Sequence, residues 1–264
     1  MTKDAVEQKA IFLAAVCGQT YDQFTNVDGS FVVPLNYTVI QTIEANSITR
    51  EWERFGFMLE SPQEIIIAFR GTSSTTNWIA DAIASQKRFP YTPDECYTHR
   101  GFTDIYVSAR TQILAALAAA SSDKTMYITG HSLGAALATL CAVDVAANTV
   151  FKSPRLFTYG SPRVGDPAFA KAFITYVPNS YRYTNLFDIV TYAPPSVYKL
   201  PKRDKKYYYS HVHTSRPLGF QKGSVGGNHV IGSYFAELSK LQRDYAAQIC
   251  AENPGFCRRS DPKG

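Results

Sequence analysis

The order of apolar and polar positions predicts one helix and then three strands in the N-terminal part of the chain. Apolar residues recur at helical spacing over 4–18, and Asp4 stands where a helix N-cap is expected. Period-2 or continuous apolar runs follow at 36–43, 54–60 and 64–69. The last run is apolar at almost every position, which is typical of a strand buried on both faces of a covered sheet.

From residue 102 onward, helical and strand patterns alternate. Helices are expected at 102–120, 132–147, 230–248 and from Pro167 with Asp166 as N-cap, and strands at 126–129, 155–159, 180–187 and 206–213. This alternation predicts an α/β fold with a mostly parallel central sheet and helices on both faces. The early strands have no helices between them, so we expect antiparallel additions at one edge. No repeat or long linker interrupts the chain, and residues 1–264 are expected to form a single domain.

The sequence Gly130-His131-Ser132-Leu133-Gly134 stands between an expected strand and an expected helix. This is the G-x-S-x-G pattern of a nucleophile elbow, in which a sharp turn exposes the serine hydroxyl and flanking glycines avoid collisions with the adjoining strand and helix. In that setting the pattern predicts an α/β-hydrolase fold with Ser132 as the nucleophile. The backbone N–H of Leu133 is then expected to bind the oxyanion.

A serine hydroxyl becomes a good nucleophile only when an imidazole accepts its proton, and in this fold the histidine follows the serine in the chain. Of the three later histidines, His211 and His213 are two residues apart in an expected strand. That pair has no third candidate metal ligand, so we interpret both as hydrogen-bonded strand residues and expect no metal site. His229 follows a glycine-rich stretch just before the last expected helix and is our candidate general base.

The triad acid is expected between the serine and the histidine, where the chain has four aspartates and no glutamate. Asp144 lies twelve residues along the nucleophile helix, about 18 Å away at 1.5 Å per residue. Asp166 is explained as an N-cap before Pro167, and Asp204 as part of a charged turn. Asp188, at the end of an expected strand, is the remaining candidate.

A second oxyanion donor is expected from the loop after the strand at 65–69. Thr72 stands in that loop and offers both its N–H and its hydroxyl, but ordinary turn chemistry explains Gly71 and the serines nearby equally well. The spacing alone therefore does not decide whether Thr72 is the second oxyanion donor.

Taken together, these residues make the chain resemble the class 3 lipases, the fungal-type triacylglycerol lipases. The matching stretches are Ala68-Phe69-Arg70-Gly71-Thr72, Asn77-Trp78, Gly101-Phe102, Ile128 to Ala135, Thr158 to Gly165, Asn185 to Asp188, Pro194-Pro195, and His229 before Ser233-Tyr234-Phe235. The resemblance implies that Ser132, Asp188 and His229 form the triad and that Thr72 and Leu133 form the oxyanion hole.

In that family the segment after the Asn-Trp pair is a lid over an acyl groove. The resemblance therefore implies a lid-like segment at about 79–98, with Ile79, Ile83, Phe89 and Tyr91 as apolar candidates. Charged residues and prolines interrupt this stretch, so strong interfacial activation does not follow.

The expected function is hydrolysis of carboxylic esters, with lipid esters, at a lipid–water interface, as substrates and no metal or organic cofactor. Feruloyl esterase and phospholipase A1-like activities remain alternatives, because fold and triad do not fix the substrate. A peptidase or an acyltransferase would use the same residues. A catalytically inactive lipid- or partner-binding protein is the alternative from another class.

Composition adds little to this interpretation. The net charge is +5, and the one dense basic run, Lys199–Lys206, is expected to be a solvated turn rather than a nucleic-acid surface. No apolar run is long enough for a transmembrane helix.

The first residues lack the pattern of a signal peptide, so the protein is either intracellular or has lost its signal, and we favour secretion. Of five cysteines, only Cys250 and Cys257 are near enough in sequence to close a small disulfide loop; oligomeric state is left open.

Overall fold

The computed structural model describes residues 1–47, 49–72, 84–199 and 204–257, and its centre is a seven-stranded sheet. The strand order is β1-β2-β3-β6-β7-β8-β11. From β3 to β11 the strands pair in parallel, whereas β1 and β2 are antiparallel additions at one edge. The strands of this sheet are β1 (Thr38–Asn46), β2 (Trp52–Glu60), β3 (Glu64–Phe69), β6 (Thr125–His131), β7 (Arg155–Tyr159), β8 (Ser180–Asn185) and β11 (Ser215–Leu218).

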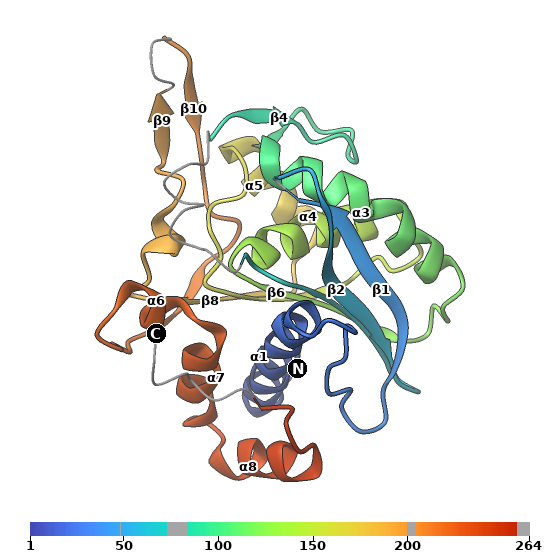
Figure 1. The fold of residues 1–264 in the computed structure, drawn as a ribbon. Helices are drawn as coiled ribbons and strands as arrows, with labels where there is room; N and C mark the ends of the chain where they lie inside the picture. The colour runs from blue at the N-terminus through green and yellow to red at the C-terminus, as the bar shows by residue number, and fades with distance from the viewer. Residues whose placement is uncertain (48, 73–83, 200–203, 258–264) are drawn as a thin grey trace.

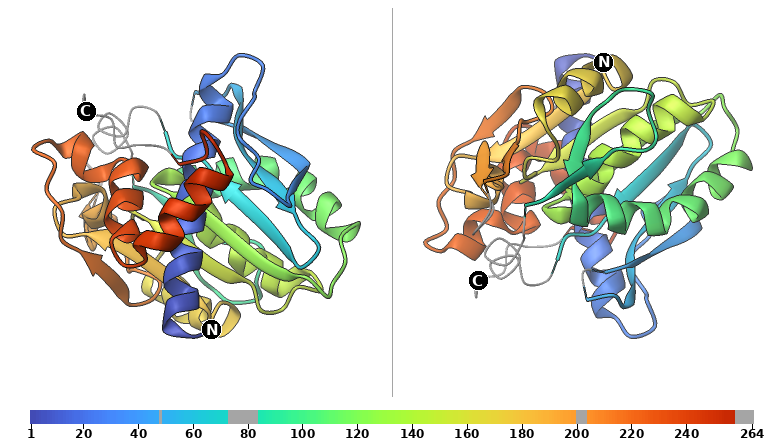
Figure 2. Two further views of the ribbon diagram at one scale, coloured as in Figure 1. Left: turned by 90° about the horizontal axis from the view of Figure 1, so that it is seen from below. Right: turned by 90° about the horizontal axis from the view of Figure 1, so that it is seen from above.

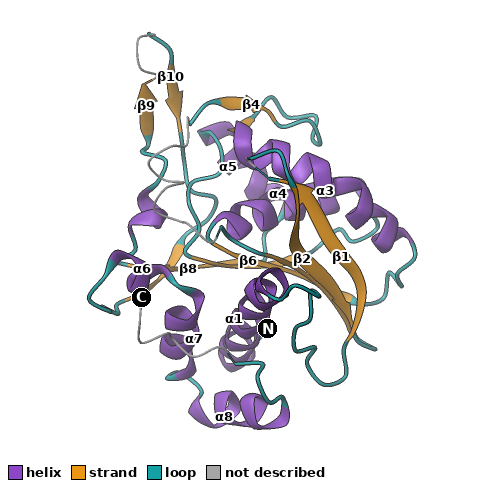
Figure 3. Cartoon of the chain, in the orientation of Figure 1, coloured by secondary structure: helices purple, strands orange, loops and turns teal. Residues whose placement is uncertain are grey.

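Helices cover both faces of the sheet (Figures 1 and 3). The helices on one face are α3 (Arg100–Ala118), α4 (Leu133–Asn148) and α5 (Pro167–Tyr176), and those on the other are α1 (Lys3–Thr25), α7 (Ile231–Ser239) and α8 (Arg243–Glu252). Each face has its own apolar core, and both faces of β3 are buried. This arrangement confirms the expected α/β fold.

Shorter elements lie outside the central sheet (Figure 2). They are the antiparallel pairs β4 (Gln86–Arg88) with β5 (Tyr97–His99) and β9 (Val197–Lys199) with β10 (Lys206–Tyr208), the 3₁₀ helix η1 (Ile189–Tyr192) and the short helix α6 (Val225–His229). The β9–β10 hairpin projects from the body of the molecule, and its strands flank the basic run (Figure 1).

Two sequence expectations were wrong in detail. The strand expected at 206–213 ends at Tyr208, and His211 and His213 lie in the irregular segment after it, where His213 has φ 99°. The last helix divides into α7 and α8, because the backbone of Gln242 is not helical (φ −142°, ψ 70°), and both parts pack on α1.

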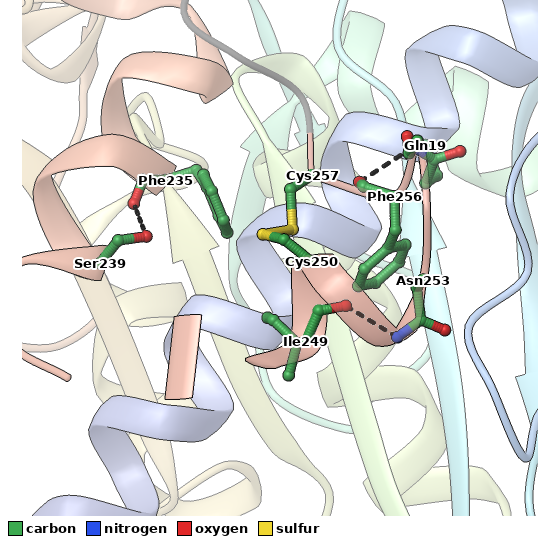
Figure 4. The surroundings of a disulfide bond; sticks show 9 residues. Gln19, Phe235, Ser239, Ile249, Cys250, Asn253, Phe256 and Cys257 are labelled. Atoms are coloured by element: carbon green, nitrogen blue, oxygen red, sulfur yellow. Dashed lines mark hydrogen bonds between the residues drawn. A yellow bond between two sulfur atoms is a disulfide. The ribbon is translucent and has the colours of Figure 1, made fainter. Parts of the chain in front are cut away.

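The N-terminal helix is also longer than the pattern indicated. It is capped by Thr2, whose hydroxyl accepts from the N–H of Ala5, rather than by Asp4. Its polar C-terminal turns are buried because Gln19 donates to the backbone carbonyls of Gly255 and Phe256. Those residues follow α8 and are joined to it by the disulfide Cys250–Cys257 (Figure 4).

Candidate active site

The carboxyl ends of four neighbouring strands converge at one edge of the sheet. In register, Phe69 of β3 pairs with Gly130 of β6, and His131 of β6 pairs with Tyr159 of β7. The residues that follow β3, β6, β7 and β8 are therefore neighbours, and this edge is where ligands bind in open α/β sheets. Thr72, Ser132 and Asp188, all predicted from the sequence, leave the sheet here.

Ser132 occupies a strained turn between β6 and α4. Its φ is 60° and its ψ is −128°, a conformation that L-residues rarely adopt. The turn is tight because its flanks approach closely. A Cβ at Gly130 would lie 2.2 Å from the carbonyl oxygen of Gly134, and one at Gly134 would lie 2.3 Å from that of Phe69. The backbone N–H of Ser132 donates to the carbonyl of Tyr159 at 3.0 Å, which fixes the turn against β7.

His229 ends α6 and is held by Asp188. The distance from His229 Nδ1 to Asp188 Oδ2 is 2.7 Å, and both side chains are buried. The same oxygen accepts from the hydroxyl of Tyr234 at 2.7 Å, and Asp188 Oδ1 accepts from the N–H of Val190 at 3.0 Å. Burial and the charge of Asp188 raise the pKa of Tyr234 well above its usual value, so the tyrosine stays a hydrogen-bond donor. The carboxylate is thus oriented on both oxygens.

Three polar atoms at this edge are buried and have no hydrogen-bond partner in the described part of the chain. They are Thr72 Oγ1, Ser132 Oγ and His229 Nε2. Buried polar atoms are nearly always paired, and exceptions need an explanation. Leu133 adds a backbone donor here, because it is the first residue of α4 and the N–H groups of a helix's first turn lack acceptors within the helix.

His131 lies beside this group with both ring nitrogens engaged. Its Nδ1 lies 2.6 Å from the hydroxyl of Tyr21 and its Nε2 2.7 Å from the backbone carbonyl of His229. Burial, and then the proximity of His229, lower the pKa of His131 well below its usual value, so the ring is neutral.

The other aspartates have structural partners elsewhere. Asp144 is buried and accepts from Tyr106 and Arg110. Asp166 caps α5, and the exposed Asp204 lies 3.3 Å from the ammonium of Lys199. Among the described residues, no cluster of three or more His, Cys, Asp or Glu side chains is arranged to hold a metal ion.

One of the lid candidates lies in the core and another packs against it. Phe89 is fully buried with its ring edge against Phe169, and Tyr91 packs edge-on to Tyr106. The placement of Phe89 does not fit a movable lid, because its ring fills space between the helices on this face of the sheet. Tyr91 is only partly buried, and its assignment to a lid stays a prediction. Ile79 and Ile83 lie outside the described residues.

Gly160 and Tyr234 also belong to this site, although no sequence expectation included them. Gly160, directly after β7, has φ +57°, and a Cβ there would lie 2.9 Å from Asp188 Oδ2 and 3.1 Å from His229 Cε1. Both residues belong to stretches that carry the family resemblance, which was the available signal. Their contacts connect positions far apart in the sequence, so no local pattern reveals them.

The sheet order, the helices on both faces and the strained serine turn define an α/β-hydrolase fold. A model of the family described as Lipase (class 3) matches residues 66–198, half of the chain. The chain therefore belongs to the class 3 lipase family.

Curated relatives and solved structures agree with this membership. A lipase of Rhizomucor miehei is 38% identical over 157 residues, 56% of this chain and 42% of the relative. The secreted mono- and diacylglycerol lipase A of Penicillium cyclopium is 38% identical over 133 residues, 49% and 43% of the two chains. A solved triacylglycerol lipase, described as having a serine protease triad as its catalytic centre, aligns with a TM-score of 0.62 and 26% identity over 74% of this chain and 76% of its own. The matched stretches span less than half of these two curated relatives.

Proposed function

We propose that this protein is a serine carboxylic-ester hydrolase that acts on lipid esters. The observation that carries the proposal is the buried pair His229–Asp188, with its outer nitrogen Nε2 unpaired at the edge where the unpaired hydroxyl of Ser132 emerges. An imidazole with one nitrogen bound to a carboxylate and the other free is the form that accepts a proton from a serine.

In the proposed reaction the ester carbonyl binds against the N–H of Leu133 and Thr72. Ser132 Oγ attacks the carbonyl carbon while His229 Nε2 takes the hydroxyl proton, and Asp188 stabilises the charged imidazole. The tetrahedral intermediate collapses, and the leaving alcohol departs with the proton from His229. Water then attacks the acyl-enzyme, gives a proton to His229, and the free acid leaves as Ser132 regains its proton. No step needs a metal or organic cofactor.

The surface around the site supports a substrate presented at a lipid–water interface. Among the described residues, large apolar side chains are exposed in the segments next to Asp188 and His229 and in the β9–β10 hairpin. They are Leu186, Phe187, Ile189, Tyr192, Val197, Tyr208, Val225 and Val230. The β9–β10 hairpin adds exposed Lys199, Lys205 and Lys206. Exposed apolar patches commonly mark membrane or partner contacts, and the lysines favour anionic lipid. No helix in the described ranges is long and apolar enough to cross a bilayer.

Export of the protein is part of the proposal. The Penicillium relative is described as secreted, and a disulfide such as Cys250–Cys257 persists in oxidising compartments.

The activity is tested by measuring, side by side, hydrolysis of a p-nitrophenyl ester series, an emulsified triglyceride, a phospholipid and a feruloyl ester. We expect hydrolysis of the lipid esters, no cleavage of amide analogues, and fluorophosphonate labelling that Ser132→Ala abolishes. A protein that is neither labelled nor active on any ester would be a binding protein instead. The highest rate on phospholipid or feruloyl ester would change the substrate class and leave the mechanism intact.

The acid is tested by comparing Asp188→Asn with Asp204→Asn. Loss of the orienting carboxylate is expected to lower kcat by about 10³–10⁴-fold, whereas the hairpin variant keeps it. Equal kcat values in these two variants would refute the assignment of Asp188.

A further inference from the structure

His131 connects three elements that the proposed reaction needs together. It ends β6 directly before Ser132, its Nε2 lies 2.7 Å from the carbonyl oxygen of His229, and its Nδ1 lies 2.6 Å from the hydroxyl of Tyr21 on α1. The imidazole is 3% exposed, and its ring centroid is 4.5 Å from that of His229. With its nitrogens occupied and its ring covered, His131 is not available to bind substrate.

The chemistry of the partners fixes the direction of both hydrogen bonds. A backbone carbonyl only accepts, so the proton of the neutral ring is on Nε2 and is donated to His229. Nδ1 is then an acceptor and receives the hydroxyl proton of Tyr21. The carbonyl of His229 therefore selects the tautomer, and the hydroxyl of Tyr21, which can donate to Nδ1, supports it.

We propose that His131 is a positioning residue, which fixes the backbone of the general base relative to the nucleophile, and that the hydrogen bond from Tyr21 supports the tautomer that makes this contact. This inference rests on the proposed function of Ser132 and His229. The two reacting groups come from β6 and from α6, a helix of five residues that contains Gly226 and Gly227 and has little rigidity of its own. The hydrogen bond from His131, the residue before Ser132, to the backbone carbonyl of His229 links these two elements directly.

The hydroxyl of Tyr21 also lies beside the loop that leads to Thr72, the candidate oxyanion residue. A Cβ at Gly71 would lie 2.3 Å from this hydroxyl, 2.8 Å from Ser132 Cβ and 2.9 Å from the carbonyl oxygen of His131. The tyrosine hydroxyl, the loop before Thr72 and the serine turn are therefore packed at one point. Displacement of a catalytic group by about 1 Å is enough to lower a rate about 100-fold, so a fixed junction here matters for kcat.

The experiment tests the hydrogen bonds of the Nδ1 and Nε2 positions of His131 separately. His131→Gln carries an amide N–H that reaches the place of Nε2, His131→Asn carries polar atoms only as far as Nδ1, and His131→Leu carries neither. We expect kcat of His131→Leu to fall about 10–100-fold with KM changed less than threefold, because the ring does not touch substrate. His131→Gln should recover most of the loss and His131→Asn little of it. Tyr21→Phe should lower kcat about 3–10-fold.

Tyr106→Phe is the matched control. It removes a buried tyrosine hydroxyl from its bond to Asp144, on the other face of the sheet, and should cost stability without lowering kcat. A purely structural role of His131 would lower the thermal midpoint of its variants and leave kcat within twofold of the wild type, which would overturn the inference. Equal recovery by Gln and Asn would overturn it as well. If His131→Leu does not fold, Tyr21→Phe and the Gln/Asn pair decide.

Labelling with a fluorophosphonate separates this inference from the proposed function. Wild-type protein that is not labelled at Ser132 would overturn both. Wild-type protein that is labelled, with variants labelled at the same rate, would overturn only the role of His131.

Discussion

Single atoms decide the geometry around Asp188 and His229, and Gly160 is the clearest case. Its backbone is in the left-handed region, and a Cβ there would lie 2.9 Å from the carboxylate oxygen that holds His229, closer than Cβ atoms ordinarily approach. Tyr234 approaches the same oxygen from another side. Asp188 and His229 are therefore closely packed, and even one methyl group added at Gly160 must move one of them.

Gly160→Ala is expected to lower kcat about 10–100-fold on a soluble ester, because a Cβ displaces the imidazole or its carboxylate. The left-handed backbone should also cost about 1–3 kcal/mol of stability. Gly255→Ala is the matched control: its φ is +85° and its Cβ would meet only a side-chain methyl of Val32 at 3.2 Å. Steady-state kinetics and urea denaturation of both variants check the prediction. A similar kcat for the two variants would contradict it.

The elements that the sequence predicted well are those whose pattern is local. Strand β3 begins and ends where the apolar run does, and the elbow motif marked the junction of β6 and α4 because close approach there demands glycine. The ends of α1 and the break between α7 and α8 were missed, since they depend on contacts across the fold. Gln19, for example, can be buried in α1 because distant segments pair with its amide: Gly255 and Phe256 accept from it, and Val32 donates to it. The contacts of Tyr21, Gly160 and Tyr234 are likewise tertiary.

The disulfide joins the end of α8 to the segment that packs on α1 (Figure 4). Phe256, beside Cys257, contacts Phe12 of α1 with ring centroids 5.5 Å apart. The bond thus keeps the C-terminal segment on a helix that also carries Tyr21, but none of its atoms reaches the candidate site.

Removing this bond in Cys250→Ser/Cys257→Ser is expected to lower the free energy of unfolding by ~2–3 kcal/mol, the loop-closure value for a loop this short. The kcat on a soluble ester should not change at temperatures where the protein stays folded. Urea denaturation with and without reductant measures the first effect, and Cys96→Ser, which alters a buried free thiol, controls for the loss of sulfur. Identical midpoints with and without the bond would show that it does not stabilise the fold.

At the scale of the molecule, buried histidines link the stability of the fold to pH. His99 and His211 have pKa values lowered to about 4 and about 3, chiefly because burial disfavours the charged ring, and the pKa of His131 is lowered well below its usual range for the same reason. The unfolded chain protonates these residues near pH 6.5, whereas the folded protein does not. Their neutral forms therefore support the fold fully above about pH 6.5, and this support is lost as the pH falls from there toward about 3.

We therefore expect the contribution of these histidines to the free energy of unfolding to be nearly constant above pH 7. Between pH 7 and pH 5 it should fall by several kcal/mol. Each of the three histidines contributes up to ~1.4 kcal/mol per pH unit in that range. Urea denaturation at half-unit intervals measures the slope. His211→Asn should reduce the slope by about a third whatever it does to the absolute stability, because one fewer proton is taken up on unfolding. A free energy that does not change between pH 7 and pH 5 would mean that these rings are protonated equally in the folded and unfolded chain.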